Sequence, residues 1–305
     1  VRVSHFAFLL NKKIRLIVLI KKFISITKPG IIFGNLITVA GGFFLASAGQ
    51  AKLFLLFITL AGISSVIAAG CVFNNIIDRD IDQIMERTKE RVMVKGLLTK
   101  RVAFAYGAVL TLVGCTLLWV YANFLTVVVA LVGLFFYVVV YTLGFKRTSV
   151  HGTLIGSISG AIPPVVGCCA VTNQLDVGAF ILFLMLSIWQ MPHSFAIAIF
   201  RFDDYLSAGI PVLPVKKGIY YAKVNMVLYV CFFTIAASLL TVFGYTGFYY
   251  LAASLAIGLW WVRLAIRGFK AENDRVWARK MFGFSIIAIT ILSIMMSLDA
   301  LPVML

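Results

Sequence analysis

Three aspartates lie within nine residues in the stretch NNIIDRDID, residues 74–82. Asn74, Asp78 and Asp82 follow one another at intervals of four, so on a helix each lies about 40° around the axis from the one before and all three share one face. Oxygen-bearing side chains on one face suit Mg²⁺, which usually takes one or two carboxylates, several waters and the phosphate oxygens of a substrate. The spacing therefore predicts a Mg²⁺ site that holds a diphosphate. The alternative is a helix end with ordinary solvent-exposed charges.

A diphosphate also needs cations, and the arginine side chain offers a planar fork that matches phosphate oxygens. The candidates are Arg91 in RTKERVMVKG, Lys146 and Arg147 in FKR, and Arg201 in FRFDDY, where Asp204 adds a further acid. Each of them alone could be a plain surface charge. Together, with acids interleaved in two of the three stretches, they predict a diphosphate site.

Membrane-spanning helices must position these side chains. Of the 305 residues, 62% are hydrophobic and only 12% are charged, which is far more apolar than a soluble domain. A helix that crosses a bilayer core of about 30 Å needs roughly 20 mostly apolar residues. Nine stretches qualify, at approximately 30–48, 53–73, 102–119, 122–143, 152–171, 178–198, 219–243, 247–266 and 281–299. None alternates as a transmembrane β-strand does, so we expect an all-α integral membrane protein with nine transmembrane helices around a central cavity.

The basic residues orient these helices, because Lys and Arg are retained on the cytoplasmic side during insertion. With a cytoplasmic N-terminus, every one of the 27 Lys and Arg residues except Lys52 falls on the cytoplasmic side. The acidic stretch 74–82 falls there too. We therefore expect a multi-pass protein of the inner (cytoplasmic) membrane with its active site on the cytoplasmic side. The net charge of +16 follows from this asymmetry and from attraction to anionic lipid, so no nucleic-acid partner is expected.

The expected domain organisation is a cytoplasmic N-terminal segment, residues 1–28, followed by a nine-helix domain, residues 29–305. The segment could be taken for a signal peptide, because basic residues precede its apolar run IRLIVLI. That run is short, lysines bracket it and no small-residue cleavage site follows. A helix lying on the cytoplasmic membrane surface is the favoured interpretation.

Small residues and prolines mark the fifth apolar stretch. Gly152, Gly156 and Gly160 recur every four residues, which predicts close helix packing. The sequence IPPVVG follows and predicts a bend whose freed carbonyls face a partner or a cavity. The five cysteines lie within or at the edges of apolar stretches and are expected to be packing residues.

Four stretches resemble the UbiA-type intramembrane prenyltransferases. AGCVFNNIIDRDIDQIMERTKERVMVKG resembles the first Asp-rich motif of that superfamily, N-D-x-x-D-x-x-x-D followed by R-T-x-x-R. The stretches TKPGIIFGNLITVAGGFFLAS, YTLGFKRTSVHGTLIGSISGAIPPVVGCCA and WQMPHSFAIAIFRFDDYLSAGIPVLPVKKG are similar to the branch that farnesylates haem. With the spans between them, the likeness covers nearly the whole chain.

The chain departs from the family pattern at three positions. Asn75 stands where many members carry Asp, and Asp203 stands where a basic residue is expected. Asp204 is followed four residues later by Ala208, whereas members that act on aromatic substrates often have D-x-x-x-D. This departure weakens the assignment to a quinone-precursor prenyltransferase and fits the haem branch.

The resemblance implies transfer of farnesyl from farnesyl diphosphate to a vinyl group of haem B, with water adding to leave a hydroxyethylfarnesyl substituent, so that the product is haem O. It also implies Mg²⁺ as cofactor. The implied catalytic residues are Asp78, Asp82, Arg91, Lys146, Arg147, Arg201 and Asp204, and the implied metal ligands are Asn74, Asp78 and Asp82. Phe73, Tyr141, Phe145 and Phe200 are candidates to shelter the allylic cation. Candidate partners are membrane lipid and the haem-copper oxidase assembly or a haem A synthase.

Neutral imidazole is a common ligand of haem iron, which makes His193 a candidate to bind haem. It follows Pro192 inside the sixth apolar stretch, and the alternative is a histidine hydrogen-bonded between helices. His151, beside Lys146 and Arg147, is the competing candidate, for haem or for a diphosphate. The alternative functions are an aromatic-substrate prenyltransferase and a secondary transporter, which would show repeated halves and acids near mid-span.

Overall fold

The computed structural model describes residues 17–302. Within that range, nine helices are long and apolar enough to cross a membrane. They are α2 (Pro29–Ser47), α3 (Leu53–Ile77), α5 (Lys100–Tyr121), α6 (Phe124–Phe135) continued by η1 (Phe136–Phe145) and α7 (Lys146–Thr148), α8 (Gly152–Thr172), α9 (Val177–Phe200), α12 (Ile219–Val242), α13 (Phe248–Arg267) continued by η2 (Gly268–Lys270), and α14 (Asp274–Leu298). The predicted all-helical membrane fold is confirmed.

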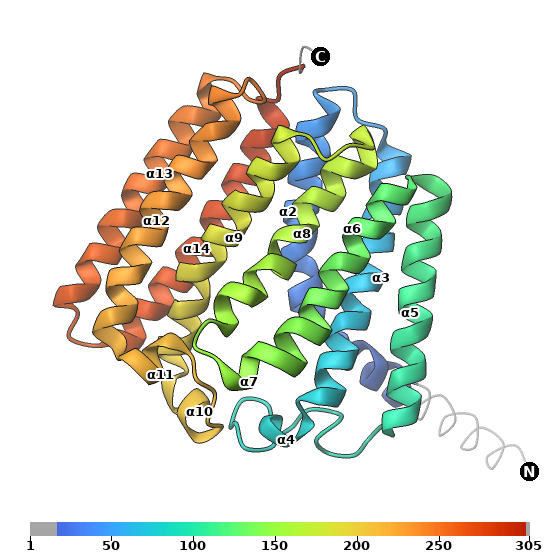
Figure 1. The fold of residues 1–305 in the computed structure, drawn as a ribbon, viewed down its shortest axis with the longest axis vertical. Helices are drawn as coiled ribbons and strands as arrows, with labels where there is room; N and C mark the ends of the chain where they lie inside the picture. Colours follow the sequence, from blue (N-terminus) through green and yellow to red (C-terminus); the bar gives the residue numbers. More distant parts are fainter. Residues whose placement is uncertain (1–16, 303–305) are drawn as a thin grey trace, which may run out of the picture.

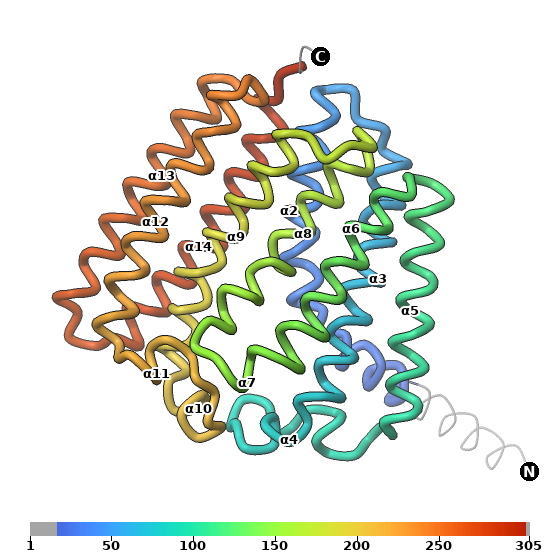
Figure 2. The backbone as a smooth tube through the Cα atoms, viewed as in Figure 1, coloured from blue at the N-terminus to red at the C-terminus, as the bar shows by residue number. Residues whose placement is uncertain are grey.

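Short elements gather at one end of the bundle (Figure 1). They are α4 (Arg79–Asp82), α7, α10 (Phe202–Ser207) and α11 (Leu213–Lys217), and we call the end that carries them the loop end. The tube in Figure 2 shows that these segments, which are far apart in sequence, reach the same end of the molecule. The acidic and basic stretches singled out above all lie in or beside these elements.

Polar residues fix several helix starts. Thr99, Asn123 and Asp176 each accept a hydrogen bond from the backbone N–H three residues on, at the starts of α5, α6 and α9. Asn273 does the same for α14 by accepting from the N–H groups of two following residues. Helix α14 therefore begins at Asp274, whereas its apolar stretch starts near 281, because the cap lets a charged first turn be helical.

Helices α2 and α8 are in backbone contact. A Cβ added to Gly42 would lie 2.1 Å from the carbonyl oxygen of Pro164, and one added to Gly167 would lie 2.1 Å from that of Val39. Only glycine fits at such crossings. The predicted glycine stripe on α8 is also tightly packed. Cβ atoms added to Gly152 and Gly156 would lie 2.9 Å and 3.1 Å from atoms of η1, and one added to Gly160 would lie 1.9 Å from an atom of α9.

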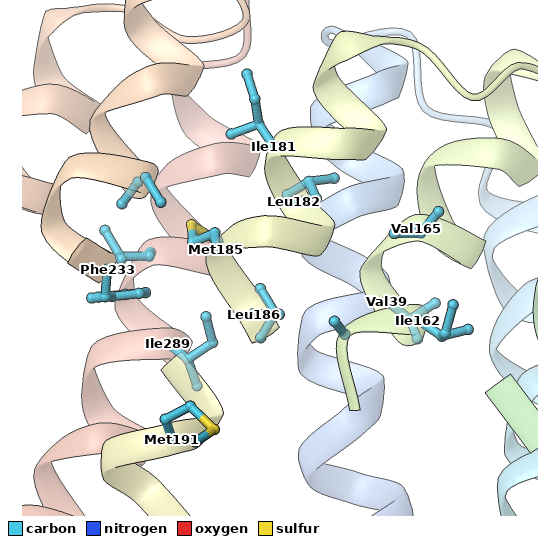
Figure 3. Packing of buried hydrophobic residues seen from close by; sticks show 14 of the residues in the cluster. Val39, Ile162, Val165, Ile181, Leu182, Met185, Leu186, Met191, Phe233 and Ile289 are labelled. Carbon is cyan, nitrogen blue, oxygen red and sulfur yellow. The ribbon is translucent and has the colours of Figure 1, made fainter. Parts of the chain in front are cut away.

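The apolar core contains buried residues from all nine spans, and Figure 3 shows part of it. Ile162 of α8, Leu186 of α9 and Ile289 of α14 belong to this core and also face the cavity described next. Large apolar side chains such as Leu112 and Trp119 are exposed on the outer surface. An exposed apolar surface of this kind is expected where a protein faces lipid.

A cavity of about 970 Å³ lies inside the bundle. Its lining comes from the long helices α2, α3, α6 with η1, α8, α9 and α14, together with loop-end residues, and within residues 17–302 neither α5, α12 nor α13 contributes to it. The cavity reaches from charged residues at the loop end to apolar residues of the core. The predicted central cavity is thus confirmed.

The last part of the predicted N-terminal segment is helical over residues 17–26, and residues 1–16 lie outside the described residues. Ile17 and Leu19 are exposed, whereas Ile26 is buried. Asn75 donates hydrogen bonds of 2.9 Å to the backbone carbonyls of both Ile26 and Cys71. An aspartate at position 75 would face two carbonyl oxygens, which explains physically why an amide suits this position.

Candidate active site

The acidic stretch lies where α3 gives way to α4. The four-residue register continues across the break, because the N–H of Asp78 bonds to the carbonyl of Asn74 and the N–H of Asp82 to that of Asp78, both at 2.8 Å. Asn74, Asp78 and Asp82 are only 4%, 0% and 3% exposed. The side chain of Asp80, in contrast, is 60% exposed. The burial argues against ordinary surface charges, since carboxylates are buried only when they are paired.

The charge of Asp78 is neutralised by two basic residues that directly follow η1. Lys146 forms an ion pair with one carboxylate oxygen of Asp78, and Arg147 approaches the other at 3.4 Å. Arg147 also binds both carboxylate oxygens of Asp80, at 2.6 Å and 2.7 Å. These hydrogen bonds hold the pKa of the Asp80 carboxyl below its usual value. The FKR stretch and the acidic stretch thus form one cluster, although 68 residues separate Asp78 from Lys146.

Asp82 has a separate cation. Arg91 bonds to its carboxylate at 2.6 Å, and the Thr88 hydroxyl donates to its backbone carbonyl at 2.7 Å. Asp82, Arg87, Arg91 and Lys146 all line the cavity. A cavity wall with three cations beside one buried acid favours an anionic ligand.

Lys28 belongs to this cluster, and the sequence reasoning missed it. Its ammonium donates to the side-chain oxygen of Asn74 at 2.5 Å. Burial lowers the pKa of Lys28 to about 8, and repulsion from nearby Arg91 adds to the effect. The available signal was its place directly before Pro29, at the start of the first apolar stretch, but there it was counted only as one of the cytoplasmic charges.

The orientation of the Asn74 amide is determined by Thr142 of the π-helix η1. The Thr142 hydroxyl donates to the carbonyl of Tyr137 at 2.7 Å. It therefore accepts from the Asn74 Nδ2, at 3.2 Å, and the same nitrogen donates to Asp78 at 2.6 Å. With its nitrogen held in this way, Asn74 presents its oxygen to Lys28 and the cavity.

His193 lines the deeper part of the cavity. Its ring is stacked on Trp189 at 4.7 Å and lies against Phe282 at 4.8 Å. The Ser285 hydroxyl donates to the Phe282 carbonyl at 2.6 Å, so at 2.7 Å it can only accept from His193 Nδ1. Nδ1 therefore carries the proton, and Nε2 keeps a free lone pair.

Three predicted site residues lie elsewhere. The Arg201 guanidinium lies over the Phe200 ring at 5.5 Å, Asp204 accepts from the backbone N–H of Glu86 at 3.1 Å, and His151 is exposed. None of the three is among the described residues that line the cavity. Sequence reasoning grouped them with the site because they share the loop end, whereas the structure gives them other surroundings.

Asp203, whose role the sequence left open, pairs with Arg275 at 2.7 Å on the exposed surface. Two further acids, Asp176 and Asp299, lie at helix ends: Asp176 caps α9 at 2.8 Å, and Asp299, just past α14, accepts from the N–H of Tyr250 at 2.7 Å. This placement at helix ends argues against the transporter, which would need acids near mid-span.

Among the predicted aromatic residues, only Tyr141 lines the cavity. Tyr137, four residues earlier on η1, also lines it and stacks on Tyr141 at 6.2 Å. Phe73 packs instead against Phe104 at 5.6 Å. The π-helix, which the apolar sequence alone does not reveal, places these two tyrosines and Thr142 at the site.

The fold and the site together are those of an intramembrane helical protein with one internal cavity, which is cationic at the loop end and apolar deeper in the bundle. The family model described as the UbiA prenyltransferase family matches residues 35–287. The chain belongs to this family.

Named relatives agree with that assignment. The chain is 59% identical to the protoheme IX farnesyltransferase of Yersinia pseudotuberculosis serotype O:1b (strain IP 31758), over 92% of this chain and 95% of that one. It is 57% identical to the protoheme IX farnesyltransferase of Photorhabdus laumondii subsp. laumondii, over 92% and 96%.

Two solved structures share the fold at low sequence identity. A digeranylgeranylglyceryl phosphate synthase structure matches with a TM-score of 0.73 and 19% identity, over 92% of this chain and 98% of that one. A UbiA homolog from Archaeoglobus fulgidus bound to GPP and Mg²⁺ matches with a TM-score of 0.68 and 15% identity, over 90% and 99%.

Proposed function

We propose that this chain transfers the farnesyl group of farnesyl diphosphate to a vinyl group of protohaem IX (haem B), giving haem O. The proposal rests on the similarity to the named farnesyltransferases and on one structural observation. A single cavity joins the cationic cluster at the loop end to His193, whose Nε2 carries a free lone pair. A diphosphate and a metalloporphyrin would thus bind in the same cavity.

The diphosphate would bind between Lys28, Arg91 and Lys146. In the described structure these cations are engaged by Asn74, Asp82 and Asp78 respectively. Their positive charge stabilises the negative charge that develops on the diphosphate as it leaves, and this is the main contribution to catalysis that the residues supply. Arg87, at the same wall of the cavity, adds a further cation for the phosphate oxygens.

Asn74, Asp78 and Asp82 fit a Mg²⁺ ion by the chemistry of their donor set, which consists of one amide and two carboxylates with hard oxygen atoms. Asn74 and Asp82 line the cavity. Within residues 17–302 no group of three or more His, Cys, Asp or Glu side chains could hold a metal alone, which suits an ion completed by substrate phosphate oxygens and water. Bound there, Mg²⁺ would neutralise charge on the diphosphate.

The farnesyl chain would extend from the loop end into the apolar part of the cavity. Tyr137 and Tyr141 both line the cavity, and their aromatic rings would stabilise a passing allylic cation. The apolar lining beyond them, including Ile162 and Leu186, keeps bulk water from the cation before the vinyl carbon attacks it.

Haem would be oriented by His193. The hydrogen bond from Nδ1–H to Ser285 fixes the tautomer, as partners of metal-binding histidines do. The aromatic rings of Trp189 and Phe282 pack against the His193 imidazole and hold it in place. Iron bound at Nε2 would keep the porphyrin in one orientation, with a vinyl edge directed toward the farnesyl group.

The orientation in the membrane and the assembly are part of the proposal. The basic residues support an inner-membrane location with a cytoplasmic N-terminus and a cytoplasmic loop end. Residues 17–28 would lie at that membrane surface, with Lys28 reaching the site. The product would pass to a haem A synthase or to the assembly of a haem-copper oxidase.

Haem extraction from cells tests the function. Membranes of a host without its own haem farnesyltransferase should contain haem O only when this chain is expressed. The purified protein with farnesyl diphosphate, haem B and Mg²⁺ should form the same product. A prenylated aromatic acid without haem O would contradict the proposal and favour the quinone-precursor alternative.

A further inference from the structure

Gln190 is a polar residue in the apolar part of the cavity that the proposed mechanism does not use. It lies on α9, three residues before His193, and both line the cavity. Its side-chain oxygen Oε1 is buried and has no hydrogen-bond partner among the described residues. A buried amide oxygen without a partner is costly, so the position calls for a donor that belongs to the reaction.

The neighbouring helix α8 is polar at the same level. Pro163 and Pro164 have no N–H to donate to the carbonyls four residues earlier, those of Ser159 and Gly160. Ser159, Gly160 and Pro163 line the cavity together with Gln190. Freed carbonyls at membrane depth are tolerated where they face a cavity or gain a partner.

Gly160 places the Gln190 amide against this part of α8. A Cβ at position 160 would lie only 1.9 Å from Gln190 Oε1 and 2.7 Å from Nε2. The amide therefore occupies space that any side chain at 160 would fill. The amide of Gln190 therefore lies beside the turn of α8 whose carbonyls the prolines free, and these polar atoms together offer the two to four partners that a buried water requires.

We infer that Gln190, together with the α8 carbonyls, holds the one water molecule that adds to haem during the reaction. The inference rests on the proposed function, because it concerns a later step of the same turnover. Departure of the diphosphate removes the electron pair of the allylic C–O bond. The vinyl π electrons form the new C–C bond at the terminal vinyl carbon and leave a positive charge on the carbon next to the pyrrole ring.

The water then completes the reaction. An oxygen lone pair forms the C–O bond to the positive carbon, and the proton that the water releases passes to the departed diphosphate. With its amide turned so that Oε1 faces the cavity instead of α8, Gln190 accepts a hydrogen bond from the water and holds the lone pair of the water toward haem at His193. Without a water at this position, the same cation loses a proton from the adjacent carbon, and the product is an alkene lighter by one water.

The ratio of these two products tests the inference. Gln190→Met replaces the amide by an apolar chain of similar length, and Gly160→Ala displaces the amide. Each should raise the ratio of dehydrated to hydroxylated farnesyl haem about tenfold, the effect of losing one hydrogen bond of ordinary strength. Gln190→Glu, which keeps an oxygen acceptor, should restore most of the hydroxylated product. Mass spectrometry of extracted haems measures the ratio.

The control is Gly283→Ala on α14, because a Cβ there meets nothing within 4 Å, and its product ratio should equal that of the parent. An unchanged ratio in folded Gln190→Met and Gly160→Ala would overturn the inference and leave the proposed function intact. So would a folded Gln190→Met that makes no farnesylated haem, since water capture follows transfer. If Gln190→Met does not fold, the product ratios of Gln190→Asn and Gly160→Ala test the inference in its place. A parent protein that makes no farnesylated haem contradicts the proposed function instead.

Discussion

Asp82 and Asp80 are two residues apart, yet one is buried against Arg91 and faces the cavity while the other is exposed and bound to Arg147. The contrast separates a candidate ligand from a structural charge. Exposed pairs of the second kind contribute little to stability. A buried acid at the wall of a cavity is instead a functional candidate.

Asp82→Asn should therefore reduce turnover at least about 100-fold while the protein remains inserted and folded, because the amide lacks the negative charge that Mg²⁺ requires. Asp80→Asn is the matched control and should keep most of the activity. Product formation across a Mg²⁺ titration is the measurement. Turnover like that of the parent at ordinary Mg²⁺ concentrations would end the metal-site proposal.

Asp78→Asn should lose activity to a similar degree and should also lower the melting temperature. Its carboxylate is fully buried between Lys146 and Arg147. Removing the charge leaves these cations without their partner.

His193→Ala should weaken haem binding about tenfold or change the haem absorbance spectrum, with little change in affinity for farnesyl diphosphate. The reason is that Nε2 is the lone pair available for iron. Absorbance titration of the purified proteins is the measurement, and His151→Ala, at an exposed position, is the control. If spectrum and affinity stay unaltered, His193 is a packing residue between α9 and α14.

At the residue scale, the sequence predicted the side chains whose relation is local. The interval of four in 74–82 was visible because a helix puts such residues on one face. Lys28 was not found, since its partner Asn74 lies 46 residues away and nothing in a run of basic residues distinguishes the buried one. Arg201 was included for its charge and for the resemblance of its stretch to the family, and in the structure its guanidinium lies over Phe200.

At the element scale, the π-helix η1 positions parts of the site that an α-helix of the same sequence would place differently. Thr142, Lys146 and Tyr141 all lie on or directly after it. Hydropathy identifies this segment as a span but cannot identify its hydrogen-bond pattern, because FYVVVYTLGF is apolar in either form. The span boundaries were predicted well where polar caps coincide with the ends of apolar runs.

Thr142→Val should raise the Mg²⁺ concentration for half-maximal activity about tenfold, with kcat at saturating Mg²⁺ little changed. The valine has the same shape but cannot accept the hydrogen bond that turns the Asn74 oxygen toward the cavity. Loss of such a supporting contact typically lowers metal affinity by about 10- to 100-fold. Thr142→Ser should restore the parent value. Equal Mg²⁺ dependence in all three proteins would contradict this role.

At the scale of the whole molecule, the nine spans followed from composition and length, and the site lies at the end where most loop charges gather. What the sequence could not give is the arrangement of helices around the cavity. The close contact of α2 with α8 depends on glycines 125 positions apart, Gly42 and Gly167. Such pairs are recognised only once the helices are placed.

The orientation in the membrane is tested by single cysteines in a chain whose five native cysteines are replaced. In intact cells, positions 52 and 176 should react with an impermeant reagent and positions 89 and 217 should not. The reason is that only one basic residue lies on the expected outer side. Cells opened by detergent provide the control, where position 89 should react. Labelling of position 89 in intact cells would reverse the proposed orientation.

The attachment of residues 26–28 to α3 has a practical consequence for expression design. The carbonyl of Ile26 is bound by Asn75 and the ammonium of Lys28 by Asn74. A shortened chain that starts at Pro29 would keep every span and pass tests of membrane insertion, yet it would lack a cation of the site. A fusion partner or purification tag at the N-terminus should therefore be joined through a linker that leaves residues 26–28 in place, or be moved to the other end of the chain.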